Sequence, residues 1–177
     1  MPTVAELRNA IRTIPDFPEQ GIQFKDITPI LASPALLSTA IHELAAPFAD
    51  SGITKVVGIE ARGFILGPLL AQELGAGFVP IRKKGKLPAE TVSATYELEY
   101  GSDTVEMHAD AVLVSDEVLI HDDVIATGGT AAAAADLVRR AGGSVLGYSF
   151  LLELSFLEGR SRLDKGIPYH ALIPVNE

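Results

Sequence analysis

The chain has 177 residues, of which 47% are hydrophobic and 21% are charged, and no stretch approaches the ~18 consecutive apolar residues of a membrane-spanning helix. This size and composition predict a single globular domain over residues 1–177, located in the cytoplasm and not in a membrane. Acidic residues outnumber basic ones by 23 to 14, and the net charge of −9 argues against nucleic-acid binding. The absence of cysteine excludes disulfides, thiolate metal sites and cysteine nucleophiles.

The first half of the chain alternates between helical and strand-like patterns. Apolar residues at helical spacing predict helices over residues 4–13, 34–48 and 64–74, the second of which begins with a capping serine followed by proline. Short apolar runs predict buried strands over residues 55–59 and 78–81.

In the second half, apolar and polar residues alternate with period two over residues 91–100, which predicts a strand with one buried face. A turn at residues 101–103 leads back into residues 104–108, so these segments predict an antiparallel hairpin. A strand from Glu117, a helix to about Ala141 and a last strand over residues 144–152 complete the pattern.

Strands that alternate with helices predict an α/β fold with a parallel sheet covered on both faces. Ligands bind such sheets at the carboxyl ends of the strands. Three unusual segments fall at those ends, namely residues 60–63, 82–86 and 122–130. We therefore expect a binding site where they meet.

Residues 117–130 read Glu-Val-Leu-Ile-His-Asp-Asp-Val-Ile-Ala-Thr-Gly-Gly-Thr, and a run of alanines follows them. A strand that passes through a glycine-rich loop into a helix presents free amides and the positive end of a helix dipole to an anion. A glycine pair is also common in ordinary turns, but buried carboxylates such as Asp122 and Asp123 need partners. Two carboxylates beside a phosphate cradle suit the vicinal hydroxyls of a sugar phosphate.

Four cations lie within five residues, at Arg82, Lys83, Lys84 and Lys86. In an acidic chain, this segment is either a solvated loop or a local site for a small polyanion such as a diphosphate. Arg62, at the end of the preceding strand, would lie at the same edge of the sheet.

Several segments together resemble one family over nearly the whole chain. Besides the motif of residues 117–130, they are Asp16-Phe-Pro, Gly21-Ile-Gln-Phe-Lys-Asp-Ile-Thr-Pro29, Gly58-Ile-Glu-Ala-Arg-Gly-Phe64, Ile81-Arg-Lys-Lys-Gly-Lys-Leu-Pro88, Tyr96-Glu-Leu-Glu-Tyr-Gly101 and Gly159-Arg160. The motif resembles the 5-phosphoribosyl 1-diphosphate site of the type I phosphoribosyltransferases, and the other segments resemble their adenine phosphoribosyltransferase family.

The resemblance implies a central parallel sheet flanked by helices, with a small hood from about residues 1–30. It also implies a flexible antiparallel hairpin loop over about residues 84–108, and a homodimer. The implied reaction converts adenine and 5-phosphoribosyl 1-diphosphate to AMP and diphosphate in purine salvage. The implied cofactor is Mg²⁺, held mainly by substrate oxygens, so no residue is named as a metal ligand.

The resemblance assigns the site residues by subsite. For the ribose 5-phosphate they are Asp122, Asp123, Ala126, Thr127, Gly128, Gly129 and Thr130. For the diphosphate they are Glu60, Ala61, Arg62, Arg82 and Lys86. For adenine they are Gln23, Phe24, Lys25 and Val124, and the catalytic residue is Glu99.

Two departures from the family pattern leave alternatives open. Many relatives carry arginine at the position of Lys25, so another purine, such as xanthine or hypoxanthine, could replace adenine. A regulator that senses the sugar diphosphate without turnover is a further alternative. His121 stands where the family usually has a branched aliphatic residue, and we expect it to be a hydrogen-bonded histidine beneath the sheet.

Overall fold

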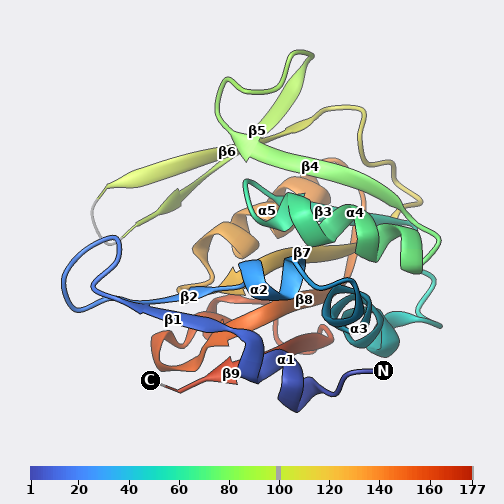
Figure 1. Ribbon diagram of the computed structural model, residues 1–177. Coiled ribbons are helices and arrows are strands. Elements are labelled where there is room, and N and C mark those ends of the chain that lie inside the picture. Colours follow the sequence, from blue (N-terminus) through green and yellow to red (C-terminus); the bar gives the residue numbers. More distant parts are fainter. Residues whose placement is uncertain (99–100, 177) are drawn as a thin grey trace. The chain divides into compact units, whose positions relative to one another are not determined.

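The computed structural model describes residues 1–98 and 101–176, and Figure 1 shows the order of the elements. The chain divides into two compact units, Met1–Glu43 and Leu44–Glu177. No helix in the described ranges is long and apolar enough to cross a membrane. The prediction of one functional domain, with a hood over residues 1–30, stays a prediction.

The first unit contains a helix, a two-stranded sheet and a short second helix, and it ends within the third helix. These elements are α1 (Val4–Ala10), β1 (Arg12–Pro15), β2 (Gln23–Asp26), α2 (Thr28–Leu31) and α3 (Pro34–Ala45). Thr3 caps α1, since its hydroxyl accepts a hydrogen bond from the Glu6 amide, and the Glu6 carboxylate accepts one from the Thr3 amide. The prediction of a helix to residue 13 was wrong, because β1 pairs with β2 and draws residues 12 and 13 into an antiparallel ladder.

The second unit is built on a seven-stranded sheet in the order β5-β6-β4-β3-β7-β8-β9, counted over the described residues. Its strands are β3 (Lys55–Ile59), β4 (Gly77–Lys83), β5 (Thr91–Glu97), β6 (Ser102–His108), β7 (Glu117–Ile125), β8 (Ser144–Leu154) and β9 (Tyr169–Val175). The five strands β4, β3, β7, β8 and β9 pair in parallel. The strands β6 and β5 form an antiparallel hairpin that joins the sheet at β4. The predicted α/β fold and hairpin are confirmed.

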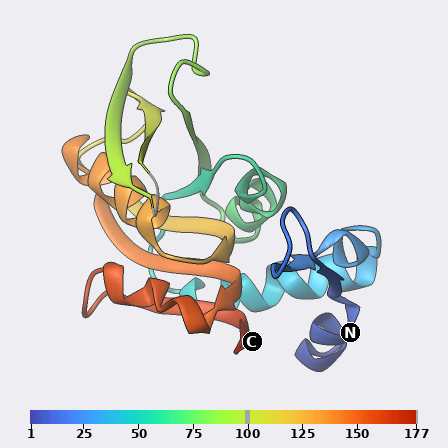
Figure 2. The ribbon, with the colours of Figure 1, turned by 90° about the vertical axis from the view of Figure 1, so that its left-hand side faces the viewer.

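The hairpin lies against a helix. Figure 2 shows β5 running alongside α5 (Gly129–Arg140). Ala94 of β5 is buried in the same apolar cluster as Ala134 and Leu137 of α5, which confirms the predicted burial of one face of this strand.

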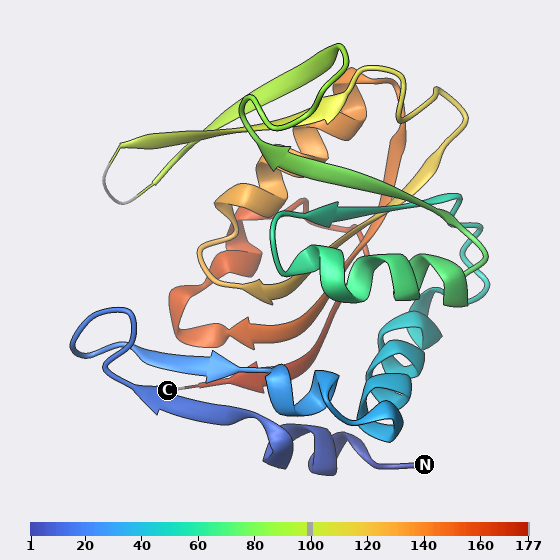
Figure 3. The ribbon, with the colours of Figure 1, turned by 45° about the horizontal axis from the view of Figure 1, so that its top comes forward.

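The two faces of the sheet carry different helices. Val57 of β3 and Ile120 of β7 share the apolar cluster of α5. The next residue of β3, Gly58, faces the other way, toward the ring of Phe78 and the start of α4 (Gly63–Glu73). Figure 3 shows α4 in front of the sheet and α5 behind it. Parallel strands between these two helices bring the loops after β3, β4 and β7 to one edge.

One packing contact reverses the usual effect of a helical glycine. Alanine is favoured over glycine within a helix by about 1 kcal/mol, but a Cβ at Gly67 would lie 2.6 Å from a ring carbon of Phe78. We expect Gly67→Ala to lower the free energy of unfolding by about 1–3 kcal/mol, measured by urea titration. Phe78→Leu is the control background, in which the same change costs less. A more stable Gly67→Ala single variant would contradict this packing.

Candidate active site

The junction between β7 and α5 forms the predicted loop. Gly128 precedes the helix with a φ of 79°, a left-handed conformation that favours glycine. In the described part of the chain, no side chain caps α5. The first amides of a helix have no carbonyl partner within it, so the amides that follow Gly128 are available to an anion beside the positive end of the helix dipole.

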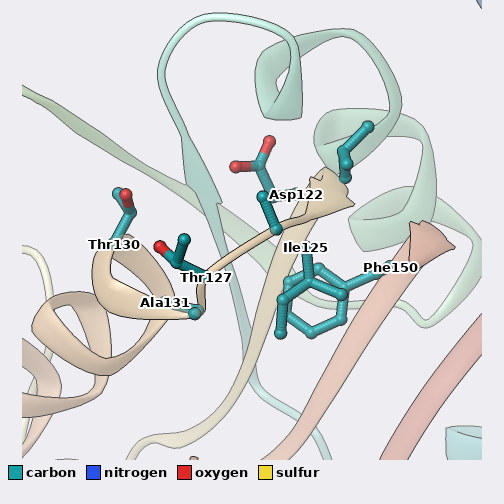
Figure 4. A pocket seen from close by; sticks show the side chains of 9 residues that line it. Asp122, Ile125, Thr127, Thr130, Ala131 and Phe150 are labelled. Atoms are coloured by element: carbon teal, nitrogen blue, oxygen red, sulfur yellow. The ribbon is translucent and has the colours of Figure 1, made fainter. Parts of the chain in front are cut away.

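A pocket of about 100 Å³ opens over this junction. Its lining residues are Asp122, Val124, Ile125, Ala126, Thr127, Gly128, Thr130, Ala131 and Phe150. Figure 4 shows the Asp122 carboxylate and the hydroxyls of Thr127 and Thr130 on the same side of the connecting segment, whereas Ile125 and Phe150 lie below it. Most of the residues predicted to hold the ribose 5-phosphate therefore line one pocket.

The two aspartates at the end of β7 play different electrostatic parts. The Asp122 carboxylate lines the pocket and accepts a hydrogen bond of 2.8 Å from the Asp123 amide. Burial raises the pKa of Asp122 well above its ordinary value, and the negative charge of Asp123 raises it further. Burial also raises the pKa of Asp123, although the Arg62 guanidinium offsets part of this effect. Ligand hydroxyls or a cation at Asp122 would relieve an unfavourable buried charge.

Arg62 links two of the predicted subsites. It directly precedes α4, and its Nε lies 2.9 Å from Oδ2 of Asp123. The diphosphate segment after β3 and the ribose segment after β7 are thus in direct contact. A Cβ at Gly63 would lie 3.0 Å from the Asp122 carboxylate, so the neighbouring glycine allows this close approach.

The Glu60 carboxylate binds the basic segment after β4. It accepts hydrogen bonds from the Lys83 amide at 2.7 Å and from Nη2 of Arg82 at 3.4 Å, and Nζ of Lys86 lies 3.6 Å away. Burial by itself would raise the pKa of Glu60, but the Lys83 amide and the Arg82 guanidinium outweigh it and lower the pKa overall. Glu60 therefore remains charged and holds two predicted diphosphate-binding cations together.

Further acidic groups hold the same basic segment. The Gly85 amide donates to the Glu106 carboxylate at 2.9 Å, and Nζ of Lys83 lies 3.2 Å from the Asp103 carboxylate. Nη1 of Arg82 also donates to the Lys86 carbonyl at 3.2 Å. These contacts favour an organised cationic site over a freely solvated loop. Its binding of a diphosphate stays a prediction.

The predicted catalytic residue Glu99 lies outside the described residues, and its role stays a prediction. The described end of β5 approaches the start of α5. A Cβ at Gly129 would lie 3.2 Å from a ring carbon of Tyr96 and 3.6 Å from the Glu97 carbonyl. The hairpin therefore reaches the edge of the phosphate loop two residues before Glu99.

The residues predicted to bind adenine fall in both units. Gln23, Phe24 and Lys25 belong to β2 of the first unit, and Val124 belongs to β7 of the second. The Phe24 ring packs edge-on against Phe17 at a centroid distance of 5.2 Å, and Nζ of Lys25 donates to the Thr13 hydroxyl at 3.1 Å. The adenine subsite stays a prediction.

Comparison with known proteins assigns the chain to a family. The phosphoribosyl transferase domain model matches residues 25–162. An adenine phosphoribosyltransferase of Thermobifida fusca (strain YX) is 61% identical over 153 residues, which are 86% of this chain and 87% of that protein. The chain belongs to the adenine phosphoribosyltransferase family.

Two solved structures of this family have the same fold. The adenine phosphoribosyltransferase of Rhodothermus marinus DSM 4252 is 61% identical and superposes with a TM-score of 0.93, covering 97% of this chain and 98% of that one. The Saccharomyces cerevisiae enzyme, complexed with an imino-altritol bisphosphate and adenine, is 46% identical with a TM-score of 0.89, covering 96% and 97%.

Sequence reasoning missed one wall of the pocket. Phe150 in the middle of β8 lines the pocket beside the loop. It is fully buried, and in the sequence it belongs to an apolar run that predicts only a strand. The pairing of Asp122 with Phe150 in the β7–β8 register brings the ring there, and such a register is not visible in local sequence.

His121 is a buried histidine within the sheet, as predicted. Its side chain is inaccessible to solvent, and its Nδ1 lies 3.0 Å from the Ser149 carbonyl. Burial lowers the pKa of His121 to about 4, although the contact with Ser149 acts in the opposite direction. The imidazole is therefore neutral at pH 7, with its Nδ1–H donating to that carbonyl.

We expect Asp122→Asn to stabilise the protein and weaken its function. A folded-state pKa above the unfolded value costs stability once the pH exceeds the unfolded pKa, because the folded state must then bury a charge or retain a proton. The amide removes this cost, so we expect a gain on the order of 1 kcal/mol at pH 7, measured by thermal unfolding. We also expect a higher KM for the sugar diphosphate. A lower melting temperature would contradict the destabilising role of Asp122.

We expect His121→Ile to flatten the acid side of the stability profile. A folded-state pKa below the unfolded value means that stability is lost as the pH falls from 6.5 toward 4, because protons bind the unfolded chain preferentially. This loss approaches about 1.4 kcal/mol per pH unit. Urea titrations from pH 7 to 4.5 on both proteins isolate the effect, since the aspartates are common to both. Parallel profiles would contradict the assignment.

Proposed function

We propose that the protein acts as an adenine phosphoribosyltransferase in purine salvage, converting adenine and 5-phosphoribosyl 1-diphosphate to AMP and diphosphate. The observation that carries this function is the pocket at the β7–α5 junction. It combines a half-buried carboxylate, two threonine hydroxyls and the amide-rich start of a helix. The family of the chain supplies the reaction.

The proposed division of the substrate follows the charges. The 5′-phosphate binds the loop amides from Ala126 to Thr130, and the ribose hydroxyls bind Asp122 and Asp123. The diphosphate binds Arg62, Arg82 and Lys86, two of which Glu60 holds together. Cations around the leaving group stabilise the charge that develops as its bond to the ribose breaks.

In the proposed chemistry, N9 of adenine forms a bond to C1 of the ribose while the bond from C1 to the diphosphate oxygen breaks. The N9 proton passes to Glu99, which acts as the general base. Adenine binds at Gln23, Phe24, Lys25 and Val124. The Saccharomyces cerevisiae relative was crystallised with adenine, which supports this choice of base.

We propose Mg²⁺ as the cofactor, and the donor chemistry of the pocket fits it. Magnesium prefers hard oxygen ligands and retains substrate phosphates and water among them. The Asp122 carboxylate lines the pocket with a raised pKa, so a nearby cation would stabilise its ionised form. Bound magnesium would neutralise part of the diphosphate charge.

We further propose a cytoplasmic homodimer. Two large apolar side chains on α4, four residues apart, remain exposed in the isolated chain, Ile65 by 42% and Leu69 by 36%. Residues at this spacing share one side of a helix, and a second copy would cover them. The cytoplasm is proposed because the nucleotide product is used inside cells.

The test of the function is conversion of labelled adenine to AMP by the purified protein with 5-phosphoribosyl 1-diphosphate and Mg²⁺. We expect Glu99→Ala to lower kcat by about 10²–10⁴-fold with little change in affinity for the sugar diphosphate. Glu97→Ala is the matched control, because Glu97 is an exposed carboxylate two residues earlier in the sequence, at the end of β5, and we expect its kcat to stay within about twofold of the unaltered protein.

The same assay separates the alternatives. Consumption of xanthine or hypoxanthine in place of adenine would reassign the base and implicate Lys25. Binding of the sugar diphosphate without any turnover would instead indicate a sensor. Unchanged kcat in Glu99→Ala would remove this residue from catalysis while leaving the transferase assignment intact.

A further inference from the structure

The backbone of the phosphate loop is in very close contact with a turn that lies some 30 residues later in the chain. The turn is a 3₁₀ helix over Gly159–Arg162, and Gly159 is buried. A Cβ at Gly159 would lie 2.1 Å from the Ala126 carbonyl oxygen and 2.9 Å from the Gly128 amide nitrogen. In the opposite direction, a Cβ at Gly128 would lie 2.2 Å from the Gly159 carbonyl oxygen. The two backbones leave no room for a side chain.

Gly159 is needed for space and not for an unusual backbone angle. Its φ does not fall in the left-handed region, where Gly128 lies at 79°. The residue before it, Glu158, does adopt a left-handed φ of 52°, which is uncommon for a residue with a side chain. The Ser161 amide donates to the Glu158 carbonyl at 2.9 Å and closes the turn. The chain thus bends sharply at Glu158 and presents the bare face of Gly159 to the loop.

The turn is anchored to the core of the second unit. Leu163 directly after it is buried in the apolar cluster that contains the α5 residues. The next residue, Asp164, accepts hydrogen bonds from the Tyr148 hydroxyl of β8 and from Arg139 of α5. The Arg160 guanidinium lies 4.6 Å from the centre of the Tyr169 ring of β9. A turn held by two strands and a helix is a rigid support.

We propose that Gly159 is a positioning residue for the 5′-phosphate, a role that rests on the proposed function. Loops rich in glycine have many accessible backbone conformations, and amides bind an anion well only when they are held in place beforehand. Gly159 restricts the segment from Ala126 to Gly128 from the side of the turn. The amides that follow this segment therefore face the pocket before the ligand arrives.

The test is Gly159→Ala, with the dissociation constants of AMP, adenine and diphosphate measured separately by calorimetry. The added methyl group must displace the loop backbone, because the contacted atoms belong to the main chain. We expect AMP affinity to fall by about 10- to 100-fold, with adenine and diphosphate affinities within about twofold of the unaltered protein. In steady state, KM for the sugar diphosphate should rise more than kcat falls.

Gly77→Ala is the matched control, since the same added Cβ there meets the flexible side chain of Lys55 at 3.2 Å, and AMP affinity should not change. Asp164→Ala is a second variant that adds no atoms. It removes the hydrogen bonds from Tyr148 and Arg139 that anchor the turn, so it should loosen the turn and weaken AMP binding severalfold, and the proposal is testable even if Gly159→Ala does not fold.

The outcomes separate this inference from the function on which it rests. Unchanged AMP affinity in either turn variant would overturn the role of Gly159, and so would an equal loss of AMP, adenine and diphosphate affinities, which indicates general damage. Failure of the unaltered protein to bind AMP would instead overturn the proposed function itself.

Discussion

Two consecutive aspartates at the end of a buried strand impose the central energetic constraint on the second unit. Burial raises the pKa of both aspartates, and the negative charge of Asp123 raises the pKa of Asp122 further. The Arg62 guanidinium lies beside Asp123, whereas the Asp122 carboxylate lines the pocket. This imbalance makes the ligand-free site less stable than it could be, and hydroxyl groups of the proposed ribose or a bound cation would relieve it. Stability and affinity are therefore opposed at Asp122.

Interactions between opposite charges also organise the basic segment at the end of β4. Glu60 contacts Arg82, the Lys83 amide and Lys86, and Glu106 fixes the Gly85 amide. In a chain of net charge −9, acidic side chains thus hold the cationic side chains of this segment close together. A diphosphate that binds there would meet cations already brought together, at a smaller cost in side-chain entropy. The proposed diphosphate site therefore depends on the acidic side chains as well as on the cations.

Local sequence predicted what depends on local patterns. The apolar run before Asp122, the glycine-rich turn after it and the alternation in β5 indicated their elements directly. The edge strand β9 was missed for two reasons. Of its seven residues, two are buried, Leu172 and Ile173, and Pro174 interrupts the strand pattern. The partners of Glu60 and the packing of Gly159 against Ala126 were also missed, since both depend on contacts between segments far apart in the chain.

In the proposed arrangement, the start of α5 holds the 5′-phosphate while the basic segment after β4 serves the other end of the substrate. A crystal structure with AMP would show where the phosphate binds. We expect the phosphate oxygens within hydrogen-bonding distance of the loop amides from Ala126 to Thr130, with the ribose hydroxyls toward Asp122 and Asp123. A phosphate bound instead between Arg82 and Lys86, with no ligand at the loop, would contradict the proposed arrangement.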